Sequence, residues 1–212
     1  MAHDNPSRDA ILARIRSALK TSAPRGEFIS HDVPLFPPVG DLLQSLQKRL
    51  AESLVDCILT TDTESSARAI CLALAALPPG GILVQDAPEL RPLVHSSERP
   101  IRWSSQGRPD ESSQATISLA EMLVASTGSV VVSSACGGRS ASIVAPCHIV
   151  YVKTSQIVPD LDAAMQRIYS TGMLKNSFIG FQTGASRTGD IEKILVHGAH
   201  GPSRVMVILQ RD

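Results

Sequence analysis

The chain has 212 residues, and its 20 Lys and Arg balance 20 Asp and Glu, so the formal net charge is zero. Because phosphate neutralisation supplies most of the affinity of a nucleic-acid binder, this balance and the lack of a basic run disfavour that class. Hydrophobic residues make up 43% of the chain and aromatic residues only 3%, which predicts a packed globular core and disfavours a stacking surface for single strands.

The N-terminal segment predicts a helix followed by an extended arm. Asn5-Pro6 provides a cap and a first helical residue. Apolar residues then recur at helical spacing, at Ile11, Leu12, Ile15 and Leu19. Four prolines follow between residues 21 and 40, a density that neither a helix nor a central strand tolerates. We therefore expect residues 1–39 to form a helical, proline-rich arm, and residues 40–212 to form the main α/β domain.

Helix and strand patterns alternate over the next segment. Asp41 opens a leucine-rich helix, and a strand-like run follows at residues 55–59. Thr61 and Glu64 have the spacing of a capping box, ahead of an alanine-rich helix over 67–77. A buried strand is expected at residues 82–84. This order is typical of a parallel α/β sheet.

The second half of the chain predicts more strands and no internal repeat. We expect strands at residues 101–103, 115–118, 130–132, 148–152, 178–181 and 205–209. A short helix is expected at 119–125 and a longer one at 160–169. Because strands are distributed along the whole chain after the arm, one domain is favoured over two.

Four loops beside predicted strands combine glycine with hydroxyl side chains. They cover residues 127–129, 137–140, 184–190 and 197–202. Glycine lets the backbone approach a ligand, and hydroxyls with loop N–H groups suit anionic oxygens. For the first two loops taken alone, an ordinary turn is the favoured explanation of the composition. The third is denser in hydrogen-bonding residues, and a salt bridge between Arg187 and Asp190 would explain only part of that density.

The histidine and cysteine spacings disfavour a metal site. His197 and His200 are three residues apart, but the glycines beside them disfavour the helix that would aim both at one ion. The four cysteines include no C-x-x-C pair, so the chain lacks the ligand spacing of an iron–sulfur cluster or a zinc ribbon. We expect Cys147 to be a core thiol; of the two, Cys136, beside two glycines and Arg139, is the better candidate for a reactive thiol, and its role stays open.

Targeting signals are not apparent. The first twenty residues carry charges throughout and have no apolar core of the kind found in signal peptides. No stretch approaches the ~18 uncharged apolar residues that a membrane span needs. We therefore expect a cytoplasmic protein with free thiols.

Several motifs carry a family likeness. They are S-R-T-G-D-I-E at residues 186–192, V-H-G-A-H-G-P at 196–202, T-G-S-V-V-V at 127–132 and P-x-H at 146–148. Together with the opening helix, they resemble the LUD-domain family, the lactate-utilization proteins of the LutC/YkgG type. The resemblance implies a Rossmann-like, mostly parallel sheet with flanking helices, similar to the ribose-phosphate isomerase, glucosamine-phosphate deaminase and CoA-transferase folds.

The same resemblance implies an accessory role in oxidising L-lactate to pyruvate. The iron–sulfur clusters of that system would belong to partner proteins, and this chain would bind no cofactor of its own. Two other functions stay open: a stand-alone enzyme of the isomerase, ligase or acyl-transfer type on the same fold, and a small-molecule sensor. Turnover by the isolated chain would favour the enzyme.

We expect three loops to converge on one pocket that binds a small anion or a partner's surface. The residues concerned are Thr127, Gly128, Ser129, Ser186, Arg187, Thr188, Asp190, His197 and His200. Arg187 would hold an anionic group in a bidentate way that Lys cannot copy. His197 or His200 would orient or protonate the ligand.

Overall fold

The computed structural model describes residues 6–20, 37–107, 112–189, 195–197 and 201–212. Contacts divide the chain into two units, Met1–Leu35 and Phe36–Asp212. In the first unit, helix α1 spans Pro6–Leu19, which confirms the expected N-terminal helix. Val39, assigned from the sequence to the arm, packs partly buried against the core of the second unit.

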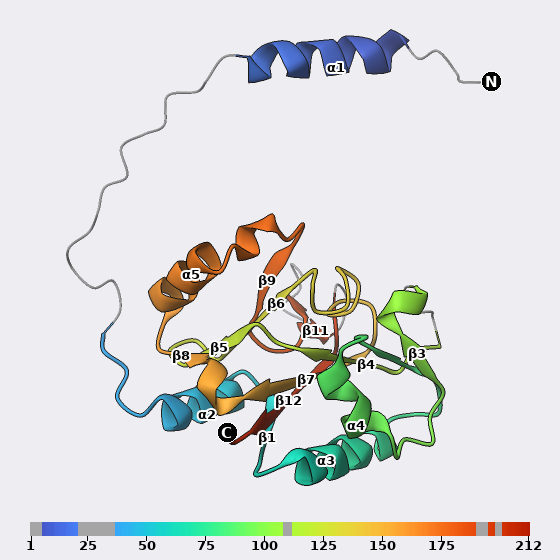
Figure 1. Ribbon diagram of the computed structural model, residues 1–212, viewed down its shortest axis with the longest axis vertical. Helices are drawn as coiled ribbons and strands as arrows, with labels where there is room; N and C mark the ends of the chain where they lie inside the picture. Colours follow the sequence, from blue (N-terminus) through green and yellow to red (C-terminus); the bar gives the residue numbers. More distant parts are fainter. Residues whose placement is uncertain (1–5, 21–36, 108–111, 190–194, 198–200) are drawn as a thin grey trace. The chain divides into compact units, whose positions relative to one another are not determined.

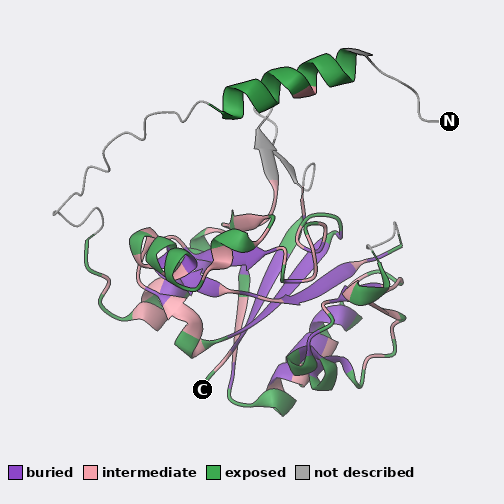
Figure 2. Cartoon of the chain, turned by 45° about the horizontal axis from the view of Figure 1, so that its top comes forward, coloured by how far each residue is buried: buried purple, intermediate pink, exposed green. Residues whose placement is uncertain are grey.

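The second unit is built on a six-stranded parallel sheet (Figure 1). Its strand order is β1-β12-β7-β4-β2-β3, and every neighbouring pair is parallel. The strands are β1 (Asp56–Thr60), β12 (Arg204–Gln210), β7 (Cys147–Lys153), β4 (Ala115–Leu119), β2 (Ile82–Val84) and β3 (Ile101–Trp103). The adjacent strands β7 and β12 are buried along nearly their whole length (Figure 2), as expected where both faces of a parallel sheet are covered.

Helices α3 (Thr63–Ala75) and α4 (Arg91–Val94) cover one face of this sheet. Ile70 and Leu93 pack there against alternate strand residues such as Ile149 and Ile208. Helix α2 (Leu42–Glu52) packs on the opposite face, where Leu50 joins the cluster formed by the intervening strand residues. The alternation of side chains along each strand therefore supplies two separate hydrophobic cores.

A second, four-stranded sheet lies over the α2 face. Its order is β8-β5-β6-β9, from β8 (Ile157–Val158), β5 (Met122–Val124), β6 (Ser129–Ser133) and β9 (Ile179–Gln182). Both ladders of β6 are antiparallel. Val130 and Val132 of β6 face the parallel sheet, whereas Val131 faces helix α5 (Leu161–Ser170). The second sheet is therefore a middle layer, covered on both faces.

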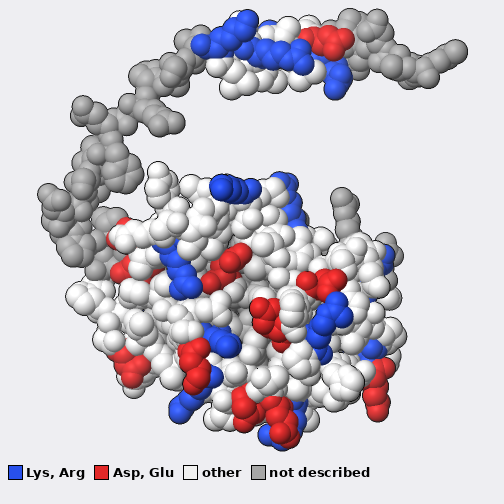
Figure 3. Space-filling view, in the orientation of Figure 1, with Lys and Arg blue, Asp and Glu red and all other residues white. Residues whose placement is uncertain are grey.

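Shorter elements complete the fold. A two-stranded antiparallel sheet joins β10 (Arg187–Gly189) to β11 (Leu195–His197). The 3-10 helices are η1 (Pro88–Leu90), η2 (Ser104–Gln106), η3 (Thr154–Gln156) and η4 (Met173–Lys175). Among the described residues, no helix combines the length and the apolar character needed to cross a bilayer. On the face of the second unit shown in Figure 3, acidic and basic side chains are interspersed.

The structure corrects two expectations. The helix expected at residues 119–125 is wrong: β4 extends to Leu119 and β5 spans Met122–Val124. A short strand buried on both faces is uniformly apolar, so its sequence cannot be told from a buried helix. Helix α3 is capped by Asp62 rather than Thr61, since Asp62 Oδ1 accepts from the Ser65 backbone N–H at 2.7 Å.

Candidate functional site

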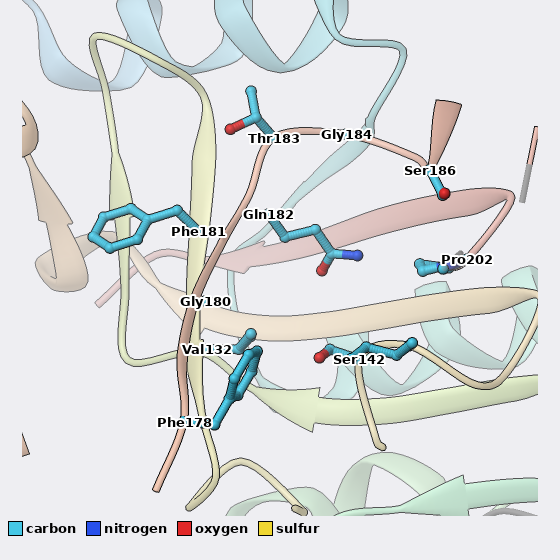
Figure 4. Close-up of a pocket in the computed structure, with 12 residues that line it drawn as sticks. Val132, Ser142, Phe178, Gly180, Phe181, Gln182, Thr183, Gly184, Ser186 and Pro202 are labelled. Carbon is cyan, nitrogen blue, oxygen red and sulfur yellow. The ribbon is translucent and has the colours of Figure 1, made fainter. Parts of the chain in front are cut away.

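A cavity of about 280 Å³ lies where β9 and the segment after it pass the N-terminal ends of β7 and β12 (Figure 4). Residues 180–184, the end of β9 and the start of the segment after it, form one side of the cavity. Ser142 and Ile143, which precede β7, and Gly201 and Pro202, which precede β12, form the other. Three segments far apart in the sequence thus meet around one hollow, and each adjoins a motif that the sequence analysis singled out.

The cavity has an apolar and a polar part. Val132 and Phe178 supply apolar surface, and Figure 4 shows the phenyl ring beside the valine. Gln182, Ser142 and Ser186 supply an amide and two hydroxyls. Figure 4 shows the Gln182 side chain extending toward Pro202. This combination suits a small ligand that has oxygen atoms at one end and an apolar group at the other.

A buried histidine contacts the polar part of the cavity wall. His148 of β7 is only 1% exposed. Its Nδ1 lies 2.8 Å from Gln182 Oε1, and its Nε2 lies 2.9 Å from the Ser118 hydroxyl. Burial lowers the pKa of His148 to about 4, although the hydrogen bond to Gln182 opposes the shift. The imidazole is therefore neutral at neutral pH and ties the parallel sheet to the second sheet.

Sequence reasoning missed Gln182, and it noticed His148 only as part of the P-x-H motif. The available signal was a polar residue inside an otherwise apolar strand, C-H-I-V-Y-V at residues 147–152. A buried polar side chain needs a partner. The partner could not be identified, because Gln182 is 34 positions away in the sequence.

The segment Thr127–Ser129 forms a tight turn against helix α2. Gly128 has φ +68°, and a Cβ there would lie 2.8 Å from Arg49 Cβ. Ser129 is buried, and its hydroxyl lies 2.7 Å from Thr127 Oγ1 and 2.6 Å from Thr183 Oγ1. Thr183 lines the cavity, but among the described lining residues Thr127, Gly128 and Ser129 do not appear. Ser129 therefore contacts the cavity wall through Thr183, and direct ligand binding by Thr127, Gly128 and Ser129 stays a prediction.

The C-terminal motif lies at the cavity and beside it. Ser186 lines the cavity, and its backbone N–H donates to the Pro202 carbonyl at 2.8 Å. The next residue, Arg187, pairs with His197 across the β10–β11 ladder, and Thr188 pairs with Val196. Asp190 and His200 lie outside the described residues. The backbone thus brings two of the predicted loops together, and ligand contacts by their side chains stay a prediction.

The loop at residues 137–140 lines a separate cavity of about 800 Å³, together with Ser104 and Ser177. Arg139 of this loop donates to the Ser177 carbonyl at 2.7 Å. Cys136 beside it is buried. Burial raises the pKa of its thiol to about 11, and the charge of Glu121 adds to the rise. The thiol is thus protonated near neutral pH, which disfavours a reactive role for Cys136, whereas Cys147 lies in the core as expected.

Comparisons with known proteins agree with these motifs. The LUD domain matches residues 107–210. The chain is 32% identical to lactate utilization protein C of Geobacillus thermodenitrificans, covering 97% of each chain. It is 28% identical to lactate utilization protein C of Bacillus subtilis, covering 73% of this chain and 72% of the other.

A solved structure shares the fold. The crystal structure of a DUF162 family protein from Deinococcus radiodurans superposes with a TM-score of 0.62. The two proteins are 15% identical, and the match covers 80% of this chain and 96% of the other. With the near full-length similarity described above, the conclusion is that this chain belongs to the LUD-domain family that includes the lactate utilization proteins C.

Proposed function

We propose that this protein takes part in lactate utilization in the cytoplasm, as an accessory subunit of a system that oxidises L-lactate to pyruvate. Relatives that carry the name lactate utilization protein C support the pathway, and one of them aligns over 97% of the chain. In this proposal, the electrons pass to iron–sulfur clusters of partner proteins. The subunit binds the small organic acid or a partner through its C-terminal loops.

The observation that carries the ligand proposal is the convergence of motifs around the cavity of about 280 Å³, which is the smaller of the two cavities described above. The segments before β7 and β12 meet β9 and the segment after it there, and together they include Ser142, Gln182, Ser186 and Pro202. A volume of about 280 Å³ is at the small end of ligand sites. It suits a short carboxylate better than a nucleotide. Arg187, next to Ser186, is proposed to supply the positive charge, with Thr188, Asp190, His197 and His200 around it.

Gene deletion tests the pathway. A deletion strain should fail to grow on L-lactate while it grows normally on glucose, and the intact gene should restore growth. Tagged protein purified without oxygen from lactate-grown cells should bring iron–sulfur proteins with it. Undiminished growth on L-lactate would contradict the proposal. Turnover of a substrate by the isolated chain, without partners, would favour the stand-alone enzyme instead.

A further inference from the structure

We infer that the side-chain amide of Gln182 is the oxygen-binding group of the smaller cavity, and that His148 holds it with its N–H₂ group toward the ligand. The inference rests on the proposed function only for the class of ligand, a short 2-hydroxy or 2-oxo carboxylate. In the structure the amide oxygen lies 2.8 Å from Nδ1 of His148, the residue beneath it. His148 acts here as a positioning residue, and Gln182 makes the contact.

The first step concerns the proton on His148. Gln182 Oε1 lies 2.8 Å from Nδ1, and an amide oxygen only accepts hydrogen bonds. Nδ1 must therefore carry a proton. Burial lowers the pKa of His148 to about 4, so at neutral pH the ring carries this single proton. Nε2 then has a lone pair, which lies 2.9 Å from the Ser118 hydroxyl and is free to accept from it.

The second step is that the ring cannot turn. His148 and Ser118 are each 1% exposed and lie on adjacent central strands of the parallel sheet. Packing from both sheets surrounds the ring, and reversing it would leave buried polar atoms without partners. The buried ring therefore keeps Nδ1 directed at the Gln182 amide, and with the proton on Nδ1 the atom that faces it is the amide oxygen.

The third step places the amide nitrogen. Figure 4 shows Nε2 directed toward Pro202, away from the oxygen. Within the described part of the chain, no hydrogen-bond partner is recorded for this nitrogen, and it is not among the fully buried unpaired atoms. Gln182 itself lines the cavity. Among the described residues, the two N–H bonds are therefore left for an incoming acceptor.

The fourth step is the chemistry of the ligand. An amide N–H₂ group only donates, so it selects a carbonyl, carboxylate or hydroxyl oxygen and rejects a cation. The Ser142 hydroxyl lies on the same cavity, and Phe178 and Val132 supply an apolar surface. A short acid with adjacent oxygens and a small apolar end matches both parts. The Gln182 amide and the His148 ring that holds it are both neutral. The amide therefore binds an oxygen atom without placing a charge in the cavity.

The tautomer of His148 tests the orientation in the full chain without any ligand. Long-range ¹H–¹⁵N NMR should show a protonated Nδ1 and an unprotonated Nε2. The Ser118 hydroxyl also lies 3.0 Å from the Leu119 carbonyl oxygen. If it donated there, Nε2 would carry the proton and the amide would be reversed, with its oxygen toward the cavity. Observation of the Nε2–H tautomer would overturn the inference.

Binding of pyruvate and L-lactate tests the contact. Both are titrated into wild type, Gln182→Glu and Gln47→Glu. The Gln182 variant still accepts from His148 but can no longer donate to the ligand. Gln47 lies on the exposed face of α2, so its variant matches the change in charge away from the cavity. We expect affinity about tenfold or more lower for Gln182→Glu, unchanged affinity for Gln47→Glu, and a shift of the Gln182 N–H₂ resonances on binding.

The two proposals fail in different ways. Wild-type affinity retained by Gln182→Glu would overturn the inference and leave the proposed function standing. Wild type that binds neither acid would overturn the ligand part of the proposed function. In that case the tautomer of His148 decides whether the inference stands. A proton on Nδ1 means that the Gln182 N–H₂ group faces the cavity, and a proton on Nε2 means that it faces away and the inference is wrong.

Discussion

Arg187 of β10 pairs with His197 of β11 across a two-stranded antiparallel sheet. The pairing brings together two polar motifs that are ten positions apart in the sequence, and Ser186, which lines the cavity, directly precedes it. Residues paired directly across an antiparallel ladder are close neighbours. Arg187 is therefore the first residue to vary when the proposed anion site is tested.

Arg187→Lys should weaken pyruvate binding by about tenfold and impair growth on L-lactate, because lysine cannot form the bidentate contact. The melting temperature should stay nearly unchanged, as measured by differential scanning calorimetry. Arg68→Lys is the matched control, since Arg68 pairs with Glu64 on the exposed face of α3. If Arg187→Lys lowers the melting temperature and leaves pyruvate binding intact, Arg187 stabilises the fold and does not bind the anion.

His148 should make the protein less stable in acid. Its pKa falls from 6.5 to about 4 on folding. Between these values the unfolded chain takes up a proton that the folded chain does not. The free energy of unfolding should thus be fully retained above pH 6.5 and fall as the pH drops toward 4, by about 3 kcal/mol from this group.

Urea unfolding at a series of pH values measures this loss. His148→Asn removes the titrating ring, so its stability should vary less between pH 6.5 and 4 than that of wild type. His95→Asn removes an exposed histidine and retains His148, so the acid loss should persist. Equal pH profiles for wild type and His148→Asn would contradict the buried, neutral histidine.

Gly128→Ala should destabilise the fold through a steric clash. A Cβ at this position would lie 2.8 Å from Arg49 Cβ and 2.9 Å from the Arg49 carbonyl carbon. Gly138→Ala is the control, because Gly138 also has a positive φ, +90°, but has no atom within 4 Å of the added Cβ. Chemical denaturation should show Gly128→Ala less stable than Gly138→Ala by about 1–3 kcal/mol. Equal losses would mean that backbone strain alone requires glycine in the turn.

Deleting residues 1–39 should leave a domain that unfolds cooperatively, because the main core lies in the second unit. Deleting only residues 1–35 should give a domain more stable by about 1 kcal/mol, since it retains the partly buried Val39 and its apolar contact. Calorimetry of both truncations checks this order. An insoluble product from both would show that the N-terminal helix belongs to the core.

The sequence alone determined the elements of the parallel sheet. Buried strands such as Cys147–Lys153 and Arg204–Gln210 are long apolar runs, and the helices between the early strands carry caps and helical spacing. These signals are local, because the spacing of apolar side chains and the capping residues are visible within a few positions of the sequence. The C-terminal motifs were also recognisable, since they are contiguous.

Only the tertiary structure decided that a second sheet exists and what lies beneath the cavity. Met122–Val124 is a strand because β6 and β8 flank it, and nothing local distinguishes it from a helix. Gly128 is required by Arg49, a residue of a distant helix. Gln182 is a candidate ligand contact because it lines the cavity and its amide oxygen lies 2.8 Å from His148 Nδ1. Each of these depends on a partner far along the chain, and the side-chain partners of a buried polar group are set by the packing of whole layers.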